Sequence, residues 1–324
     1  MCTSISYKAN DHYFGRNLDL EYSYNETVVI TPRNYSFSFR RAASLDVHFS
    51  MIGMAFVVDG YPLYYDATNE HGLSMAGLNF PTNADYKEPA DGKENITPFE
   101  FIPWILGRCK TVDEARVLLS GLNLMNESFS EELPLSPLHW MIADQSKSIV
   151  VESVKDGLMI YDNPVGVMTN NPPFDKQLAN LNNYMTLSAE EPKNTFAKTL
   201  ELDAYSRGMG AIGLPGDMSS ASRFVKAAFV LNNSVAGESE EEQVSQFFHI
   251  LQSVEQPRGS VHLGGDKYEI TIYSSCCYTA KGIYYYKTYE NSQITAVDMR
   301  KENLDGHELI IFELIKDQQI AIEN

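Results

Sequence analysis

Apolar residues recur in short runs through the first quarter of the chain, and these runs are typical of β-strands. They are rich in β-branched, aromatic and other apolar residues and are bounded by Gly, Pro, Asn or Asp, as strands commonly are. Four such runs occupy residues 2–7, 27–31, 51–59 and 72–79. The third is apolar at consecutive positions, so both of its faces should be buried within a sheet.

Helical spacing begins near residue 98. A helical stretch is expected over residues 98–109, and a second helix should begin at Thr111 and stop at Gly121. Thr111 and Glu114 have the spacing of a capping box, in which each side chain accepts a hydrogen bond from the other residue's backbone N–H.

Three later stripes of apolar residues, spaced by three and four positions, each predict a helix with one buried face. They are Phe174, Leu178, Leu181 and Met185; Phe224, Ala227, Ala228 and Leu231; and Val244, Phe247, Phe248 and Leu251. The acidic run 238–242 should form the solvated first turn of the last helix, where the helix dipole favours negative charge.

Strand-like runs also lie on either side of these three helices. They cover residues 138–143, 148–153, 158–162, 269–275, 282–289, 292–299 and 308–314, and the first two should form a hairpin. Strands and helices that do not alternate strictly predict an α+β fold, with antiparallel sheets covered by helices. No linker or repeat divides the sequence, so we expect residues 1–324 to form a single domain.

The excess of acidic residues argues against two classes of binding partner. The chain has 25 Lys and Arg against 43 Asp and Glu, a formal net charge of -18, which repels both nucleic-acid phosphates and anionic membranes. A small anionic substrate stays compatible, because salt screens charge beyond about 8 Å. No stretch has the length and apolar character of a signal segment or a membrane span, so a cytoplasmic protein is expected.

The four cysteines do not have the spacing of a disulfide framework or of a zinc site. Cys276 and Cys277 are best interpreted as strand residues that face opposite sides. Cys2 is different, because removal of Met1 would leave a thiol and a free α-amine on one residue. The reference pKa values of these groups are about 8.5 and about 7.7 to 8.0, so the amine can act as the base for its own thiol.

Arg16 and Asp19 are the first candidates to assist Cys2. They lie one short strand-turn-strand after it and can therefore fold back beside it. A guanidinium there would favour the thiolate, and a carboxylate would accept from the α-ammonium. Taken alone, an Arg and an Asp three residues apart would be a surface pair. His71 and His139 suggest a Cys-His dyad, but neither spacing places them near Cys2, so we interpret both as structural.

Several motifs, in order along the chain, resemble those of the choloylglycine hydrolases, which comprise conjugated bile salt hydrolases and penicillin V acylases. They are Cys2-Thr3-Ser4-Ile5, Phe14-Gly15-Arg16-Asn17-Leu18-Asp19, Asn69-Glu70-His71-Gly72-Leu73, Ala76-Gly77-Leu78-Asn79-Phe80, Leu138-His139-Trp140, Thr169-Asn170-Asn171-Pro172, Gly213-Leu214-Pro215-Gly216-Asp217 and Ser222-Arg223-Phe224. The likeness runs from residue 2 to the end without a large insertion.

The resemblance implies an N-terminal-nucleophile (Ntn) hydrolase fold, in which two antiparallel sheets lie between helix layers in αββα order. It also implies that Met1 is removed, that no cofactor or metal takes part, and that the protein is a homo-oligomer, a tetramer. The roles it implies are Cys2 as nucleophile, Asp19 orienting the Cys2 amine, Arg16 next to the sulfur, Asn79 and Asn170 in the oxyanion hole, and Arg223 as a supporting cation.

By the same resemblance the substrate is a bile acid conjugated to glycine or taurine. Bile salt hydrolases typically carry Asn at the position of Asn79, whereas penicillin V acylases typically carry Tyr. The following Pro81-Thr82-Asn83 departs from the Gly-Tyr pair that close relatives often have, so the pocket loop differs here. The alternatives are a penicillin V acylase or other N-acyl amidase and, from another class, a steroid- or lipid-binding protein without turnover.

Overall fold

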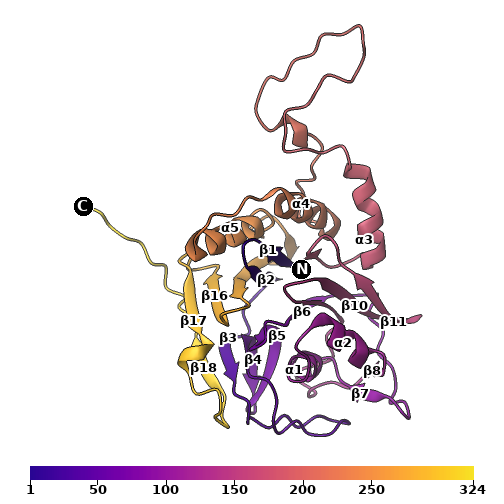
Figure 1. Ribbon diagram of the computed structural model, residues 1–324, viewed down its shortest axis with the longest axis vertical. Helices are drawn as coiled ribbons and strands as arrows, with labels where there is room; N and C mark the ends of the chain where they lie inside the picture. The colour runs from indigo at the N-terminus through magenta and orange to yellow at the C-terminus, as the bar shows by residue number, and fades with distance from the viewer.

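Two large antiparallel sheets lie face to face between two pairs of helices in the computed structural model, which describes residues 1–324 (Figure 1). Helices α4 (Ser220–Asn233) and α5 (Glu240–Gln252) pack on the first sheet, and α1 (Phe101–Leu106) packs on the second, with α2 (Val112–Leu119) beside it. This is the αββα order of the expected Ntn-hydrolase fold.

The first sheet combines the two N-terminal strands with three strands from the C-terminal part of the chain and one short strand from its middle. In spatial order it contains β12 (Val167–Met168), β1 (Cys2–Lys8), β2 (His12–Leu20), β15 (Ile270–Tyr278), β16 (Ile283–Thr288) and β17 (Thr295–Asp298). Gly15 allows β2 and β15 to lie close together, because a Cβ at Gly15 would come within 2.0 Å of the Ser275 carbonyl oxygen. Any side chain at this position would therefore push the two strands apart.

The second sheet has more strands, and each of its two faces packs against a hydrophobic core. Its order is β11 (Gly157–Asp162), β10 (Ser148–Val154), β9 (Leu138–Ala143), β6 (Ser74–Asn79), β5 (Tyr61–Asn69), β4 (Met51–Val58), β3 (Thr27–Thr31) and β18 (Ile310–Glu313). Its successive side chains alternate between two cores. Val28 and Ile30 join the core between the sheets, whereas Val29 joins the core under α1 and α2.

Smaller elements complete the chain. They are β7 (Glu94–Ile96), β8 (Leu122–Leu124), α3 (Phe174–Asn180), β13 (His262–Gly264), β14 (Lys267–Tyr268) and the 3-10 turns η1 (Leu181–Tyr184), η2 (Met209–Ala211) and η3 (Met299–Lys301). Residues 186–216, which we call the arm, project away from the body between η1 and α4 (Figure 1). None of the helices combines the length and apolar character that crossing a lipid bilayer requires.

Two details of the predicted helices are wrong. Met185 does not continue the stripe of Phe174, because α3 ends at Asn180 and Met185 is 76% exposed. The Thr111 side chain does accept from the Glu114 N–H, but the Glu114 carboxylate accepts from the N–H of Lys110 and so does not close a capping box. A full capping box forms instead at Ser239 and Glu242, at the start of α5.

Candidate active site

Cys2 is the first residue of β1 and lies opposite Leu18 in the β1–β2 hairpin. Its side chain is buried, at 2% exposure. The same register places Ser4 opposite Arg16 and Thr3 opposite Asn17. The hairpin therefore brings the Cys2 thiol to the segment that contains Arg16 and Asp19, as the sequence predicted.

The buried Arg16 side chain contacts the Cys2 thiol. Its Nη2 donates to Cys2 Sγ at 2.7 Å, and its Nη1 donates to the backbone carbonyls of Gly77 at 2.5 Å and Tyr65 at 3.1 Å. Burial works against the charge of Arg16, but the nearby Cys2, Tyr273 and Asp66 outweigh it and raise the pKa of the guanidinium. The Arg16 guanidinium therefore places a positive charge directly against the Cys2 sulfur.

Asp66 is a buried carboxylate close to Arg16 that the sequence analysis did not single out. It accepts hydrogen bonds from the hydroxyl groups of Tyr273 and Tyr284, each at 2.7 Å, and of Ser275 at 3.2 Å. Burial raises the pKa of Asp66, while Arg16 and these three donors oppose that shift. No motif signals this group, because its donors come from β15 and β16, more than 200 residues away.

The Asp19 carboxylate is held on one oxygen only. Its Oδ1 accepts from Thr271 Oγ1 at 2.7 Å, whereas Oδ2 is buried without a hydrogen-bond partner and lies 3.8 Å from Arg223 Nη1. Burial raises the pKa of Asp19, although the charge of Arg223 and the hydrogen bond from Thr271 oppose the shift. One carboxylate oxygen of Asp19 is thus available to another donor.

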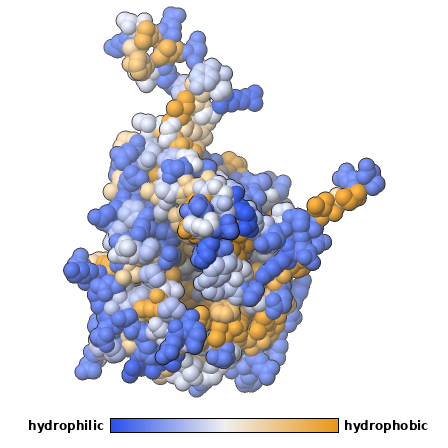
Figure 2. Space-filling model, turned by 180° about the vertical axis from the view of Figure 1, so that it is seen from behind, coloured by the Kyte–Doolittle hydropathy of each residue, from blue (hydrophilic) through white to orange (hydrophobic).

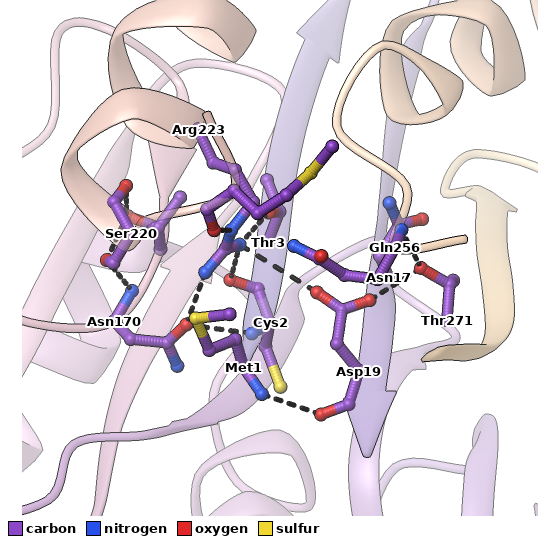
Figure 3. A network of polar contacts seen from close by, with 12 residues as sticks. Met1, Cys2, Thr3, Asn17, Asp19, Asn170, Ser220, Arg223, Gln256 and Thr271 are labelled. Atoms are coloured by element: carbon purple, nitrogen blue, oxygen red, sulfur yellow. Dashed lines mark hydrogen bonds and ion pairs between the residues drawn. The ribbon is translucent and has the colours of Figure 1, made fainter. Parts of the chain in front are cut away.

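Arg223 and Asn170 bind the backbone of the first residues of β1 (Figure 3). Arg223 donates through Nη1 to the Cys2 carbonyl at 2.6 Å and through Nη2 to Asn170 Oδ1 at 2.8 Å. Asn170 Oδ1 also accepts from the Cys2 N–H at 2.8 Å. These contacts explain why α4 carries a cation near its N-terminus, where the helix dipole opposes positive charge.

Asn79 differs from Asn170 in how its amide is used. Asn170 Nδ2 donates to the backbone carbonyl of Asn79 at 2.6 Å, which commits one of its two amide hydrogens. Asn79 is the last residue of β6 and is partly exposed, and its side-chain amide makes no hydrogen bond within the protein. Both side chains therefore keep a hydrogen that could meet an oxyanion.

Met1 is still attached in this structure and continues the hairpin by one more pair. Its ammonium donates to the Asp19 carbonyl at 2.7 Å, the Asp19 N–H donates to the Met1 carbonyl at 2.9 Å, and Glu269 forms an ion pair with the ammonium. Burial lowers the pKa of this amine, against the charges of Cys2 and Asp19. The amine that contacts Asp19 here is thus that of Met1, and it contacts the backbone instead of the carboxylate.

His139 supports the strand-end residues near Asn170. Its two ring nitrogens bond to Glu152 Oε1 at 3.0 Å and to the Thr169 carbonyl at 2.8 Å, and its ring stacks on Phe80. His71 contacts the ring of Phe49. Neither histidine bonds to Cys2.

Three comparisons with known proteins agree with this geometry. The model of the family "Linear amide C-N hydrolases, choloylglycine hydrolase family" matches residues 2–312. A protein of Lactiplantibacillus plantarum named "Bile salt hydrolase/transferase" is 58% identical over 324 residues, with 100% of both chains covered.

Solved structures match as well. A crystal structure of conjugated bile acid hydrolase from Clostridium perfringens superposes with a TM-score of 0.92 at 40% identity, covering 100% of each chain. Penicillin V acylase from Agrobacterium tumefaciens gives a TM-score of 0.76 at 22% identity, covering 96% of this chain and 91% of that one, and thus shares the fold. This protein therefore belongs to the choloylglycine hydrolase family of linear amide C–N hydrolases.

Proposed function

We propose that this protein hydrolyses the amide bond of bile salts conjugated to glycine or taurine, with Cys2 as the nucleophile. The observation that carries the proposal is the Cys2 thiol, buried and 2.7 Å from the Arg16 guanidinium at the start of a strand. The names of the Lactiplantibacillus and Clostridium relatives support the choice of substrate.

In the proposed mechanism, cleavage of the Met1–Cys2 peptide bond frees the Cys2 α-amine. The amine takes the thiol proton, and the thiolate attacks the acyl carbon of the substrate. Asp19 Oδ2, which has no partner while Met1 is present, then orients the new ammonium. That ammonium protonates the departing amine, and water repeats the sequence on the thioester.

The oxyanion of the tetrahedral intermediate would bind the side-chain amide of Asn79 and the second amide hydrogen of Asn170. Hydrogen-bond donors at such a position stabilise the transition state more than the ground state. Arg223 fixes Asn170 and the Cys2 carbonyl, and we propose that it acts as a supporting cation. No step of this mechanism calls for a metal or a cofactor.

A hydrolysis panel tests the function. Glycine- and taurine-conjugated bile salts are compared with penicillin V by kcat/KM. We expect a bile salt to be the best substrate, because Asn79 occupies the position where acylases carry Tyr. A higher kcat/KM for penicillin V than for every bile salt would contradict the substrate and leave the cysteine mechanism standing. Binding of bile salts without turnover would instead favour the alternative of a lipid-binding protein.

The proposed start at Cys2 is tested by intact-mass measurement. The active preparation should lack Met1, because only then does Cys2 carry a free amine. An active protein that retains Met1 throughout would rule out the N-terminal-nucleophile mechanism.

We also propose a tetramer in the cytoplasm. The arm presents apolar side chains to solvent, as Figure 2 shows, and they include Phe196 at 81%, Tyr205 at 85% and Ile212 at 64% exposure. Light scattering should give the mass of four chains, and Phe196→Asp with Tyr205→Asp should lower it. The reducing cytoplasm suits a protein whose four cysteines are free thiols.

A further inference from the structure

The Asp66 carboxylate is a buried group that the proposed mechanism does not use. It is 2% exposed, and it accepts hydrogen bonds from the hydroxyl groups of Tyr273, Ser275 and Tyr284, all in the first sheet. Several donors on one carboxyl group favour its ionised form. A neutral side chain could join the two sheets at a lower cost, because an ionised group loses its hydration on burial. The charge of Asp66 therefore calls for a role.

A β-bulge turns Asp66 towards the first sheet. In the pairing of β4 with β5, Ala55 lies opposite Tyr64 and Met54 lies opposite Asp66, so Tyr65 is an extra residue on β5. In a regular strand Tyr64 and Asp66 would share a face. Here Tyr64 packs in the core under α1 and α2, whereas Asp66 bonds to the first sheet. Bulges often redirect a side chain beside an active site.

The same segment connects Asp66 to Arg16 in two ways. Arg16 Nη1 donates to the carbonyl of the bulged Tyr65 at 3.1 Å. The Arg16 N–H donates to Ser275 Oγ at 3.1 Å, and Ser275 donates its one hydroxyl hydrogen to Asp66 Oδ2 at 3.2 Å. The other end of the guanidinium contacts Cys2 Sγ. Arg16 therefore lies between a buried carboxylate and the thiol in this chain of contacts.

We propose that Asp66 is a positioning residue that acts on Cys2 through Arg16, as the countercharge of the guanidinium. The Asp66 carboxylate and the thiolate of the proposed mechanism then share one buried cation. Each weakens the stabilisation of the other, because like charges in a buried site repel. A thiolate that is stabilised less is the better nucleophile, since nucleophilicity falls as a thiol becomes more acidic. The inference rests on the proposed role of Cys2 and adds Asp66 to it.

The titratable groups that face Asp66 from the neighbouring strands are neutral, apart from Arg16. Burial raises the pKa of each of them, so they stay uncharged around neutral pH; they are Tyr65 on β5, Tyr273 and Cys277 on β15, and Tyr284 on β16. The residues opposite Asp66 on β4 and β6 are Met54 and Ala76, which carry no charge. Arg16 is therefore the group whose charge Asp66 balances.

Alkylation of Cys2 by iodoacetamide tests the inference without a substrate. The rate is followed against pH on the peptide that contains Cys2, in the wild type and in Asp66→Asn. Loss of the countercharge should move the midpoint of the profile to lower pH by about one unit. The rate above the midpoint should fall about threefold, because the thiolate becomes less nucleophilic. An unmoved midpoint, or one at higher pH, would overturn the proposal.

A matched control tests whether the effect is specific to Asp66. Glu100→Gln also removes one buried carboxylate, but at the start of α1, where Glu100 accepts from the Thr97 N–H at 2.9 Å. Its alkylation profile should keep the wild-type midpoint. A shift equal to that of Asp66→Asn would count against a specific role for Asp66.

A second variant separates the charge of Asp66 from its part in folding. Asp66→Leu combined with Tyr273→Phe and Tyr284→Phe removes the carboxylate together with two of its donors, so these hydroxyl groups are not left without an acceptor. It should move the midpoint to lower pH, as Asp66→Asn does. A carboxylate that only ties the sheets together predicts the opposite, because loosened sheets would withdraw Arg16 from the sulfur and move the midpoint to higher pH.

Hydrolysis of conjugated bile salts is measured on the same proteins, so that the two proposals can fail separately. A wild type that hydrolyses no conjugate, together with the expected shift in Asp66→Asn, would refute the proposed function and support the role of Asp66. Normal hydrolysis by the wild type with an unmoved midpoint in Asp66→Asn would refute the role of Asp66 alone.

Discussion

The two ends of the β1–β2 hairpin bury polar groups in opposite ways. At the Cys2 end, Arg16, Asp19 and Arg223 are buried as charged groups that contact one another or the thiol. At the turn end, His12 is equally buried but uncharged. Burial lowers its pKa to about 4, and its ring nitrogens bond to Ser6 and Thr279. The same hairpin thus has charged buried side chains at its Cys2 end and a neutral buried histidine at its turn end.

This difference shows that the burial of polar residues does not by itself identify an active site. A polar cavity of about 520 Å³ opens beside the turn end, where Lys8, His12 and Lys147 line it. No cysteine lines this cavity. The Cys2 end is recognised because several charged side chains are buried there against a thiol. Their burial costs desolvation energy that a purely structural site has no reason to bear.

The strongest test of the comparison is Cys2→Ala. We expect turnover to fall at least a thousandfold, because the covalent step disappears, while the melting temperature and circular dichroism stay close to wild type. Hydrolysis above one thousandth of wild type would redirect attention to Cys109, Cys276 or Cys277. These thiols are buried, and burial raises the pKa of Cys109 and Cys277 to about 12, so they are poor substitutes.

The next test is Asn79→Ala. If the Asn79 amide meets the oxyanion, kcat for bile salts should fall roughly a hundredfold or more with a smaller change in KM, because the bond forms only as charge develops. Asn79→Tyr should be worse for bile salts and should spare penicillin V more. A wild-type kcat for Asn79→Ala would leave Asn170 and backbone donors as the oxyanion hole.

A smaller effect is expected from Thr271→Val, which removes the donor to Asp19 Oδ1. Burial already raises the pKa of Asp19, and loss of a bond to its charged form raises it further. In the proposed mechanism the ionised Asp19 carboxylate is the active form, so the acid limb of the pH profile of kcat/KM should move to higher pH. Activity at acidic pH should drop several-fold, with little change at neutral pH. Thr271→Ser should restore the profile, and an unshifted profile would contradict the role.

The mildest test lies at the turn end and concerns stability only. His12 has its pKa lowered from 6.5 to about 4 in the folded protein, so the unfolded chain binds its proton first. Stability is therefore lost as pH falls from 6.5 towards 4, by about 3 kcal/mol for this residue. Chemical denaturation of His12→Asn should show a shallower loss over that range. A large change in kcat for this variant would contradict the conclusion that the turn end of the hairpin affects stability only.

The sequence located the strands and most of the helices because their apolar periodicity reflects burial on one face. It failed at Met185, where a stripe with the right spacing continues beyond the end of α3 to the residue that follows η1. Tyr61–Asn69 was not recognised as a strand, since its alternating pattern includes Pro62 and charged Asp66. That it is a single domain stays a prediction.

Cys2, Arg16 and Asp19 were named from their chemistry and spacing, whereas Asn79, Asn170 and Arg223 could be named only through the family resemblance. The roles of all six remain proposals. Sequence spacing did place Arg16 beside Cys2, because a hairpin is a local structure. Thr271, Asp66 and Glu269 could not be found in this way. Thr271 reaches the site through the pairing of β15 with β2, Glu269 directly precedes β15, and Asp66 contacts the first sheet from β5 of the second. A single sequence carries no pattern for such contacts between segments far apart in the chain.

Arg16 also ties the two sheets together. It belongs to the first sheet, yet its Nη1 binds the carbonyls of Tyr65 and Gly77 in the second. The guanidinium can thus be fixed against the thiol only after the sheets have docked. Under the proposed mechanism, a chain that is still folding would therefore carry Cys2 without its cation, and the reactivity of the thiol would report completed assembly of the two sheets.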